Sequence, residues 1–130
     1  MNQFVTKIVI ALVVLLIDYA WLNYAKSFYG DRIEKVQKEK MKINNIGVVL
    51  TYSVLAFGLH YIMNINSKPK TLGQAIERGA IYGFVTYSIF NGTTMSIFND
   101  WDEGVAIVDT SWGTILNGIS GALYFLGNVT

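Results

Sequence analysis

Four long apolar stretches, separated by shorter polar segments, dominate the pattern of the chain. They cover about residues 4–24, 43–65, 75–98 and 104–126. An α-helix needs about 20 apolar residues to cross a bilayer core of roughly 30 Å, and each stretch approaches or exceeds that length. The pattern predicts an all-α protein with a single membrane domain over residues 1–130, in which four transmembrane helices form an antiparallel bundle.

The polar segment between the first two stretches has the pattern of a short amphipathic helix. Over residues 28–42, Ile33 and Val36 fall on one helical face, and Asp31 and Lys35 form a charge pair four residues apart. We interpret this segment as a helix that lies at the membrane interface. A solvated helical connector without membrane contact is the alternative.

Composition supports the membrane class. Of 130 residues, 52% are hydrophobic and 15% are charged, which is too apolar for an ordinary soluble domain. The net charge of +1, without an uninterrupted basic block, gives no reason to expect nucleic acid as a partner. We therefore expect an integral, multi-pass membrane protein whose main partner is the lipid bilayer.

Positive charges favour one orientation by a small margin. Four spans place both chain ends on one side and the first and third loops on the other. The loop side carries Lys26, Arg32, Lys35, Lys38, Lys40 and Lys42. The terminal side carries Lys7, Lys68, Lys70 and Arg78. The positive-inside rule favours a cytoplasmic first loop.

Small residues repeat every four positions in the last two stretches. Gly79 and Gly83 form one such ridge, and Thr114, Gly118 and Ala122 form another. Ridges of this kind allow helices to approach closely in membranes. Because four helices in a short chain enclose little space, we expect a homo-oligomer in which a conduction path lies between protomers.

Two carboxylates fall inside the apolar stretches. Asp18-Tyr19-Ala20-Trp21 and Asp109-Thr110-Ser111-Trp112 share the pattern Asp-x-x-Trp. Because the first lies near the end of an outgoing helix and the second near the start of a returning one, antiparallel threading puts both acids in one leaflet, roughly 5–10 Å from the midplane. An ionisable residue within a span is costly, so it marks a functional site by default.

The same counting brings polar side chains of the second and third stretches to this depth. Tyr87, Asn91 and Thr94 share one helical face. The candidate ligand-binding or ion-binding site comprises Asp18, Trp21, Tyr52, Tyr87, Asn91, Thr94, Asp109 and Trp112. The Asp-x-x-Trp spacing also favours a pairing of each aspartate with the tryptophan of its own helix.

His60 and Trp101 have simpler interpretations. His60 falls in the opposite leaflet, where a lone histidine near a helix end is more often a satisfied interfacial residue than part of a proton path. A proton path from the acids to His60 is kept as the alternative. Trp101, in the acidic turn before the last stretch, is interpreted as an interfacial tryptophan.

Motifs of soluble enzymes are missing from the chain. The sequence holds no Walker loop, no Gly-x-Ser-x-Gly and no paired-histidine zinc motif. With no cysteine, it also has no thiolate zinc site. We assign no catalytic residue, metal site or cofactor, and enzymatic activity is the less favoured expectation.

With these residues in view, the chain resembles a family of small membrane proteins known as domain of unknown function 2177, which has bacterial and large-DNA-virus members. The resemblance runs nearly end to end. It is carried by Ile17-Asp18-Tyr19-Ala20-Trp21-Leu22, Phe28-Tyr29, Tyr87-x-x-x-Asn91-x-Thr93-Thr94, Trp101 and Ile107-Val108-Asp109-x-x-Trp112-Gly113-Thr114. It implies four transmembrane helices and a shared polar motif, without an established activity.

One departure from the family pattern bears on mechanism. Many members have an acid where this chain has Asn91 and an asparagine where it has Thr94. The departure weakens any mechanism that needs a third carboxylate.

Three functions fit the sequence. In the first, the cluster binds a cation, a proton or a small polar solute, in a small transporter or channel component. In the second, the protein binds or modifies a lipid or another membrane-soluble ligand. In the third, it is a structural assembly protein, for instance of a viral membrane, whose acids are saturated by internal hydrogen bonds with no adjoining cavity.

Overall fold

The computed structural model describes residues 2–129, and within them it contains five helices and no strand. Helix α1 spans Gln3–Tyr24, α2 spans Lys26–Gln37 and α3 spans Asn45–Asn64. Helix α4 spans Leu72–Ile97 and α5 spans Glu103–Leu126. The all-α class is confirmed.

Capping side chains fix where the four long helices begin. Asn2 accepts a hydrogen bond from the backbone N–H of Phe4 at the start of α1, and Asn44 accepts two such bonds at the start of α3. Thr71 and Asp102 do the same for α4 and α5. Each cap satisfies backbone donors that the first turn leaves free, and stabilises its helix by about 1 kcal/mol.

Helices α1 and α3 have the length and composition of membrane spans. Their most apolar windows have mean hydropathies of 2.2 and 1.7, and only 11% of the residues in each window are buried. Among residues 2–129, these are the two helices that meet both criteria. Helices α4 and α5 are long enough, but charged, amide and glycine residues lower their hydropathy.

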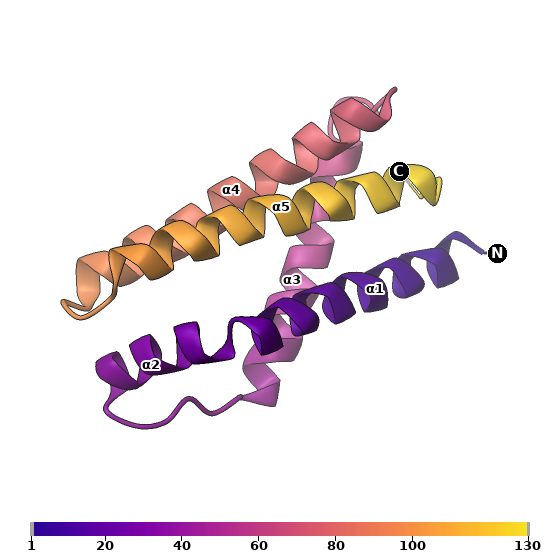
Figure 1. Ribbon diagram of the computed structural model, residues 1–130. Helices are drawn as coiled ribbons and strands as arrows, with labels where there is room; N and C mark the ends of the chain where they lie inside the picture. The colour runs from indigo at the N-terminus through magenta and orange to yellow at the C-terminus, as the bar shows by residue number, and fades with distance from the viewer. Residues whose placement is uncertain (1, 130) are drawn as a thin grey trace.

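Three of the long helices lie with similar axis directions, and the fourth runs across them. In Figure 1, α1, α4 and α5 run alongside one another, whereas α3 passes steeply behind them. The expected antiparallel bundle therefore describes α1, α4 and α5 better than α3. Residues 38–44 have no helix and connect the end of α2 to the start of α3.

Helices α4 and α5 form the closest pair because glycines let their backbones touch. A Cβ atom at Gly79 would overlap the carbonyl oxygen of Asn117, and one at Gly83 would overlap that of Gly113. The predicted close approach at Gly79 and Gly83 thus occurs within the chain. These glycines therefore give no support to the expected homo-oligomer, which stays a prediction.

The second small-residue ridge has a different position. Thr114, Gly118 and Ala122 border an apolar hollow on the α4–α5 surface that Ile76 and Ala80 also line. The glycines of α4 contact Gly113 and Asn117 of α5. Each of these residues lies one position before a residue of the ridge, Thr114 or Gly118. The closest contact therefore falls beside the predicted ridge.

Replacing Gly83 with alanine should destabilise the protein by about 1–3 kcal/mol, because the added methyl group would push α4 and α5 apart. Gly92→Ala is the matched control on the same helix. Nothing lies within 4 Å of a Cβ atom at Gly92, so that change should be neutral or stabilise by up to about 1 kcal/mol. Thermal unfolding of both variants in detergent micelles measures the difference. Equal effects would contradict the backbone contact.

Candidate functional site

Asp18 lies between three helices, and both of its carboxylate oxygens accept hydrogen bonds. Its side chain is buried, with 6% of the residue exposed. Trp112 of α5 donates its indole N–H to Oδ1 at 2.7 Å. Tyr52 of α3 donates its hydroxyl to Oδ2. A single carboxyl group of α1 thereby joins α1, α3 and α5.

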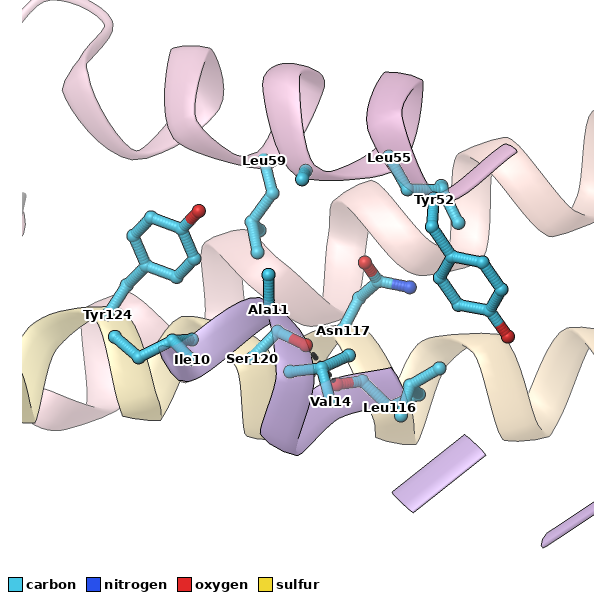
Figure 2. A pocket seen from close by; sticks show the side chains of 11 residues that line it. Ile10, Ala11, Val14, Tyr52, Leu55, Leu59, Leu116, Asn117, Ser120 and Tyr124 are labelled. Atoms are coloured by element: carbon cyan, nitrogen blue, oxygen red, sulfur yellow. Dashed lines mark hydrogen bonds between the residues drawn. The ribbon is translucent and has the colours of Figure 1, made fainter. Parts of the chain in front are cut away.

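A small cavity begins beside Tyr52. Its volume is about 50 Å³, and Figure 2 shows Tyr52 at one end, Tyr124 at the other, and Asn117 and Ser120 between them. Asn117 and Ser120 are buried, at 4% and 2% exposure, and each donates a hydrogen bond to a carbonyl of its own helix. The cavity thus has polar groups within mainly aliphatic walls.

Asp109 accepts hydrogen bonds from two further helices. Asn91 of α4 donates its amide N–H to Oδ2 at 2.8 Å, and Tyr29 of α2 donates its hydroxyl to Oδ1 at 3.3 Å. The bond from Tyr29 is longer than most O–H···O bonds, so this carboxylate oxygen is held less firmly. Asp18 of α1 and Asp109 of α5 thus accept hydrogen bonds from side chains of the other helices: α3 and α5 at Asp18, α2 and α4 at Asp109.

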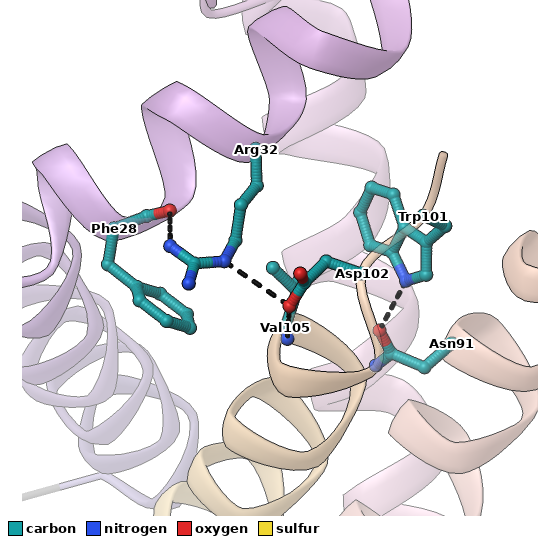
Figure 3. A network of polar contacts seen from close by, with 6 residues as sticks. All are labelled: Phe28, Arg32, Asn91, Trp101, Asp102 and Val105. Carbon is teal, nitrogen blue, oxygen red and sulfur yellow. Dashed lines mark hydrogen bonds and ion pairs between the residues drawn. The ribbon is translucent and has the colours of Figure 1, made fainter. Parts of the chain in front are cut away.

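Asn91 extends the network to the turn before α5. Its carbonyl oxygen accepts the indole N–H of Trp101 at 3.2 Å, as Figure 3 shows, while its amide group also donates to the backbone oxygen of Tyr87 at 2.9 Å. Trp101 therefore also has a contact within the cluster, in addition to the interfacial position expected for it. Its N–H fixes the orientation of the amide that binds Asp109.

Trp21 and Trp112 stack on each other, with ring centroids 4.6 Å apart and planes 13° from parallel. The favoured pairing of each aspartate with the tryptophan of its own helix is wrong. Both rings enter the same space between α1 and α5, where stacking leaves the N–H of Trp112 directed at Asp18 across the interface. The Nε1 atom of Trp21 is buried and has no hydrogen-bond partner among residues 2–129.

Tyr87, Thr94 and His60 have separate environments. The ring of Tyr87 packs directly on Gly113, and Tyr87 and Asp109 line a common cavity. Thr94 stays outside the cluster, because its hydroxyl donates to the backbone oxygen of Phe90 at 2.6 Å. His60 lies 3.5 Å from the Nζ atom of Lys7, measured from Nε2, and its ring is 6.3 Å from that of Tyr124. The structure therefore gathers all the predicted cluster residues except Thr94.

Tyr29 is a cluster residue that the helical pattern did not assign to the site. It is 6% exposed and packs with Ala25 and Val105, so α2 covers the start of α5. Burial raises the pKa of Tyr29 to about 12, which keeps the phenol protonated as a donor to Asp109 at neutral pH. In the sequence, the motif Phe28-Tyr29 of the family resemblance was the signal that could have assigned Tyr29 to the site.

Arg32 and Asp102 close the edge of the cluster (Figure 3). Arg32 Nε lies 3.3 Å from Asp102 Oδ1, and its guanidinium carbon lies 3.9 Å from the ring centroid of Phe28. The backbone N–H of Val105 holds the pKa of Asp102 below its ordinary value, with Arg32 acting in the same direction. The pair links α2 to the N-terminus of α5.

Asp109 lines two cavities. One has a volume of about 430 Å³ and lies among α1, α2, the linker and the turn between α4 and α5. The other, of about 330 Å³, is lined by residues of α3, α4 and α5. Both have mainly apolar walls, and Asp109 is the acidic residue in each lining. Within residues 2–129, no group of three or more histidine, aspartate or glutamate residues could hold a metal ion.

Comparison with known proteins agrees with the sequence resemblance. The model of the family described as a predicted membrane protein, domain of unknown function 2177, matches residues 4–126. No curated protein and no solved structure matches the chain. The expected resemblance is confirmed, and the family description supplies the membrane class without an activity.

Removing the indole N–H of Trp112 should show how strongly the cluster holds the helices together. Trp112→Phe and Asp18→Asn should each destabilise the protein, and a double-mutant cycle should give a coupling of about 1–3 kcal/mol. Tyr19→Phe, a change at an exposed aromatic residue of α1, is the control. Additive effects of Trp112→Phe and Asp18→Asn would exclude the contact.

Asp102 should contribute to the acid sensitivity of the fold. Because its folded pKa is below the ordinary value of 3.8, its stabilisation is present above that pH and is lost as pH falls through the folded pKa. Asp102→Asn should therefore lose less stability than the parent when unfolding is measured from about pH 5 down to about pH 2. Asp100→Asn, at an exposed ion pair, is the control. An unchanged acid slope for Asp102→Asn would refute the assignment.

Proposed function

Because the chain belongs to the domain of unknown function 2177 family of predicted membrane proteins, we propose that it is a four-pass integral membrane protein whose acid cluster binds and transfers a proton. In this proposal it acts as a small transporter or channel component. Helices α1, α3, α4 and α5 are the four spans, and α2 lies at the interface.

The surface of α4 and α5 supports their place in the bilayer. Large apolar side chains of both helices point outward: Ile81, Phe84 and Ile89 on α4, and Ile107 and Ile115 on α5, are each more than half exposed. The polar residues Asn91 and Asn117 are buried instead. Apolar side chains on the outside and polar side chains in the interior suit a hydrocarbon environment, although both helices have modest mean hydropathy.

The donors around the acids favour a proton over a metal cation. Asp18 and Asp109 accept hydrogen bonds from tyrosine, tryptophan and asparagine, all of which are neutral donors. A metal ion needs lone pairs directed at it, whereas these groups direct hydrogen atoms toward the site. A proton needs only one carboxylate oxygen and removes the cost of a charge within the membrane.

The cavity between Tyr52 and Tyr124 is the observation that carries the proposal (Figure 2). Its volume of about 50 Å³ exceeds the roughly 10–15 Å³ that one water molecule requires, and Asn117 offers a polar contact. Tyr52 lines this cavity and donates its hydroxyl to Asp18, and beyond Tyr124 lie His60 and Lys7. In this proposal, water in the cavity connects these polar residues, as the proton-path alternative for His60 requires.

A purely structural role is less well supported. That role requires acids saturated by internal hydrogen bonds without an adjoining cavity, whereas Asp109 lines two cavities. If the first loop is cytoplasmic, as the charge distribution favours, the acid cluster opens toward the cytoplasmic leaflet and His60 lies toward the other side.

Proton flux into liposomes, followed with a trapped pH-sensitive dye under an imposed potential, tests the proposal. The parent should conduct protons. Asp18→Asn and Tyr52→Phe should reduce the flux to the level of empty liposomes, because they remove the acid and the hydroxyl that contacts it. Thr94→Val, which changes a hydroxyl outside the cluster, should conduct like the parent. Parent liposomes without flux, or unchanged flux in Asp18→Asn, would reject the function.

A further inference from the structure

The larger cavity beside Asp109 has the features of a separate binding site. We call this cavity of about 430 Å³ the lateral groove. Its volume lies within the range of roughly 300–1,000 Å³ that is typical of sites for small molecules. It lies among α1, α2, the linker after α2 and the turn between α4 and α5. The acid path described above leaves from Asp18 on the other side of the cluster and does not use this groove.

Two opposite charges line the lateral groove. Lys26, at the start of α2, is the cation, and Asp109, on α5, is the anion. They form no salt bridge with each other, nor does either take part in the ion pairs found within residues 2–129. Each residue can therefore attract a ligand group of the opposite charge.

Aromatic side chains complete the surroundings of the acidic end. Tyr29 and Trp101 line the groove together with Asp109, and Tyr19 and Phe90 contribute further rings. Aromatic faces attract ammonium groups through their π electrons, and this attraction strengthens where water is scarce. The acidic end of the groove thus suits an ammonium group better than a metal ion.

The remaining wall of the lateral groove is apolar and, in the proposed topology, lies next to lipid. Leu22, Ile33 and Ile43 line the groove, and Ile43 is 74% exposed. These residues belong to the end of α1, the amphipathic helix and the linker, which the proposed topology places at the interface. Acyl chains could lie against this wall while a headgroup enters the groove.

We propose that the lateral groove binds one zwitterionic phospholipid, with its phosphate at Lys26 and its ammonium group at Asp109 among the aromatic rings. The charge arrangement selects this class. An anionic lipid without an ammonium group would bring its phosphate to Lys26 but leave Asp109 unmatched, and a cationic amphiphile would leave Lys26 unmatched. When the ammonium group lies on Asp109, Asp18 is the acid left to exchange a proton.

Native mass spectrometry of the full-length protein, with lipids added to the detergent-purified sample, tests this inference. The parent should bind one phosphatidylethanolamine or phosphatidylcholine molecule in preference to phosphatidylglycerol. Lys26→Gln should weaken binding of the zwitterionic lipids by about fivefold, because one favourable lysine contact is lost. Lys40→Gln, at an exposed position that does not line the groove, should bind like the parent.

The variant Asp109→Asn, measured in the same mass spectrometry experiment, tests the acidic end of the groove. It should weaken binding of the zwitterionic lipids and bring phosphatidylglycerol closer to them, because the unmatched negative charge is gone. Equal binding of zwitterionic and anionic lipids by the parent, or unchanged binding in Lys26→Gln, would overturn the inference. Lys26 is an exposed residue outside the acid path, so this variant should fold and keep its proton flux. Failure of lipid selectivity is therefore distinguishable from failure of the proposed proton transfer.

Discussion

The burial of Asp18 is the constraint on which the rest of the structure depends. A carboxyl group at 6% exposure, on a helix with apolar surroundings, needs hydrogen-bond donors, and α1 supplies none to it. The donors come from Tyr52 on α3 and Trp112 on α5. Where lipid removes the hydrophobic driving force between helices, such polar contacts and close packing take its place.

Asp18 and Asp109 have different surroundings because of how the helices pack. The glycine contact between α4 and α5 and the position of α3 are the two features that matter. Because α4 and α5 pack backbone to backbone, Asn91 and Asp109 face each other at hydrogen-bond distance. Helix α3 contributes Tyr52 to Asp18, whereas Asp109 lines two cavities, one of which has Thr51 and Leu55 of α3 in its wall. Asp18 is therefore buried, and Asp109 lies at the edge of a groove.

The sequence predicted the helices and the convergence of the acids for identifiable reasons. Long apolar stretches predict the four long helices, and antiparallel threading of the two Asp-x-x-Trp motifs predicts that Asp18 and Asp109 lie near each other. Helical periodicity could not predict partners across helices. It gave Thr94 the same face as Asn91, but the Thr94 hydroxyl bonds to its own backbone. The tilt of α3, the inward turn of Tyr29 and the contact of Trp101 with Asn91 depend on tertiary packing.

The contact between Trp112 and Asp18 is the most direct test of this account, and solid-state NMR of the protein in lipid bilayers can measure it. The sample carries ¹⁵N in the tryptophan indoles and ¹³C in the aspartate carboxyl groups, and Trp112→Phe assigns the signal. The account predicts a dipolar coupling between Trp112 Nε1 and the Asp18 carboxyl carbon, as their N···O distance of 2.7 Å requires. Absence of that coupling in the folded parent would contradict the convergence of the five helices on the two aspartates.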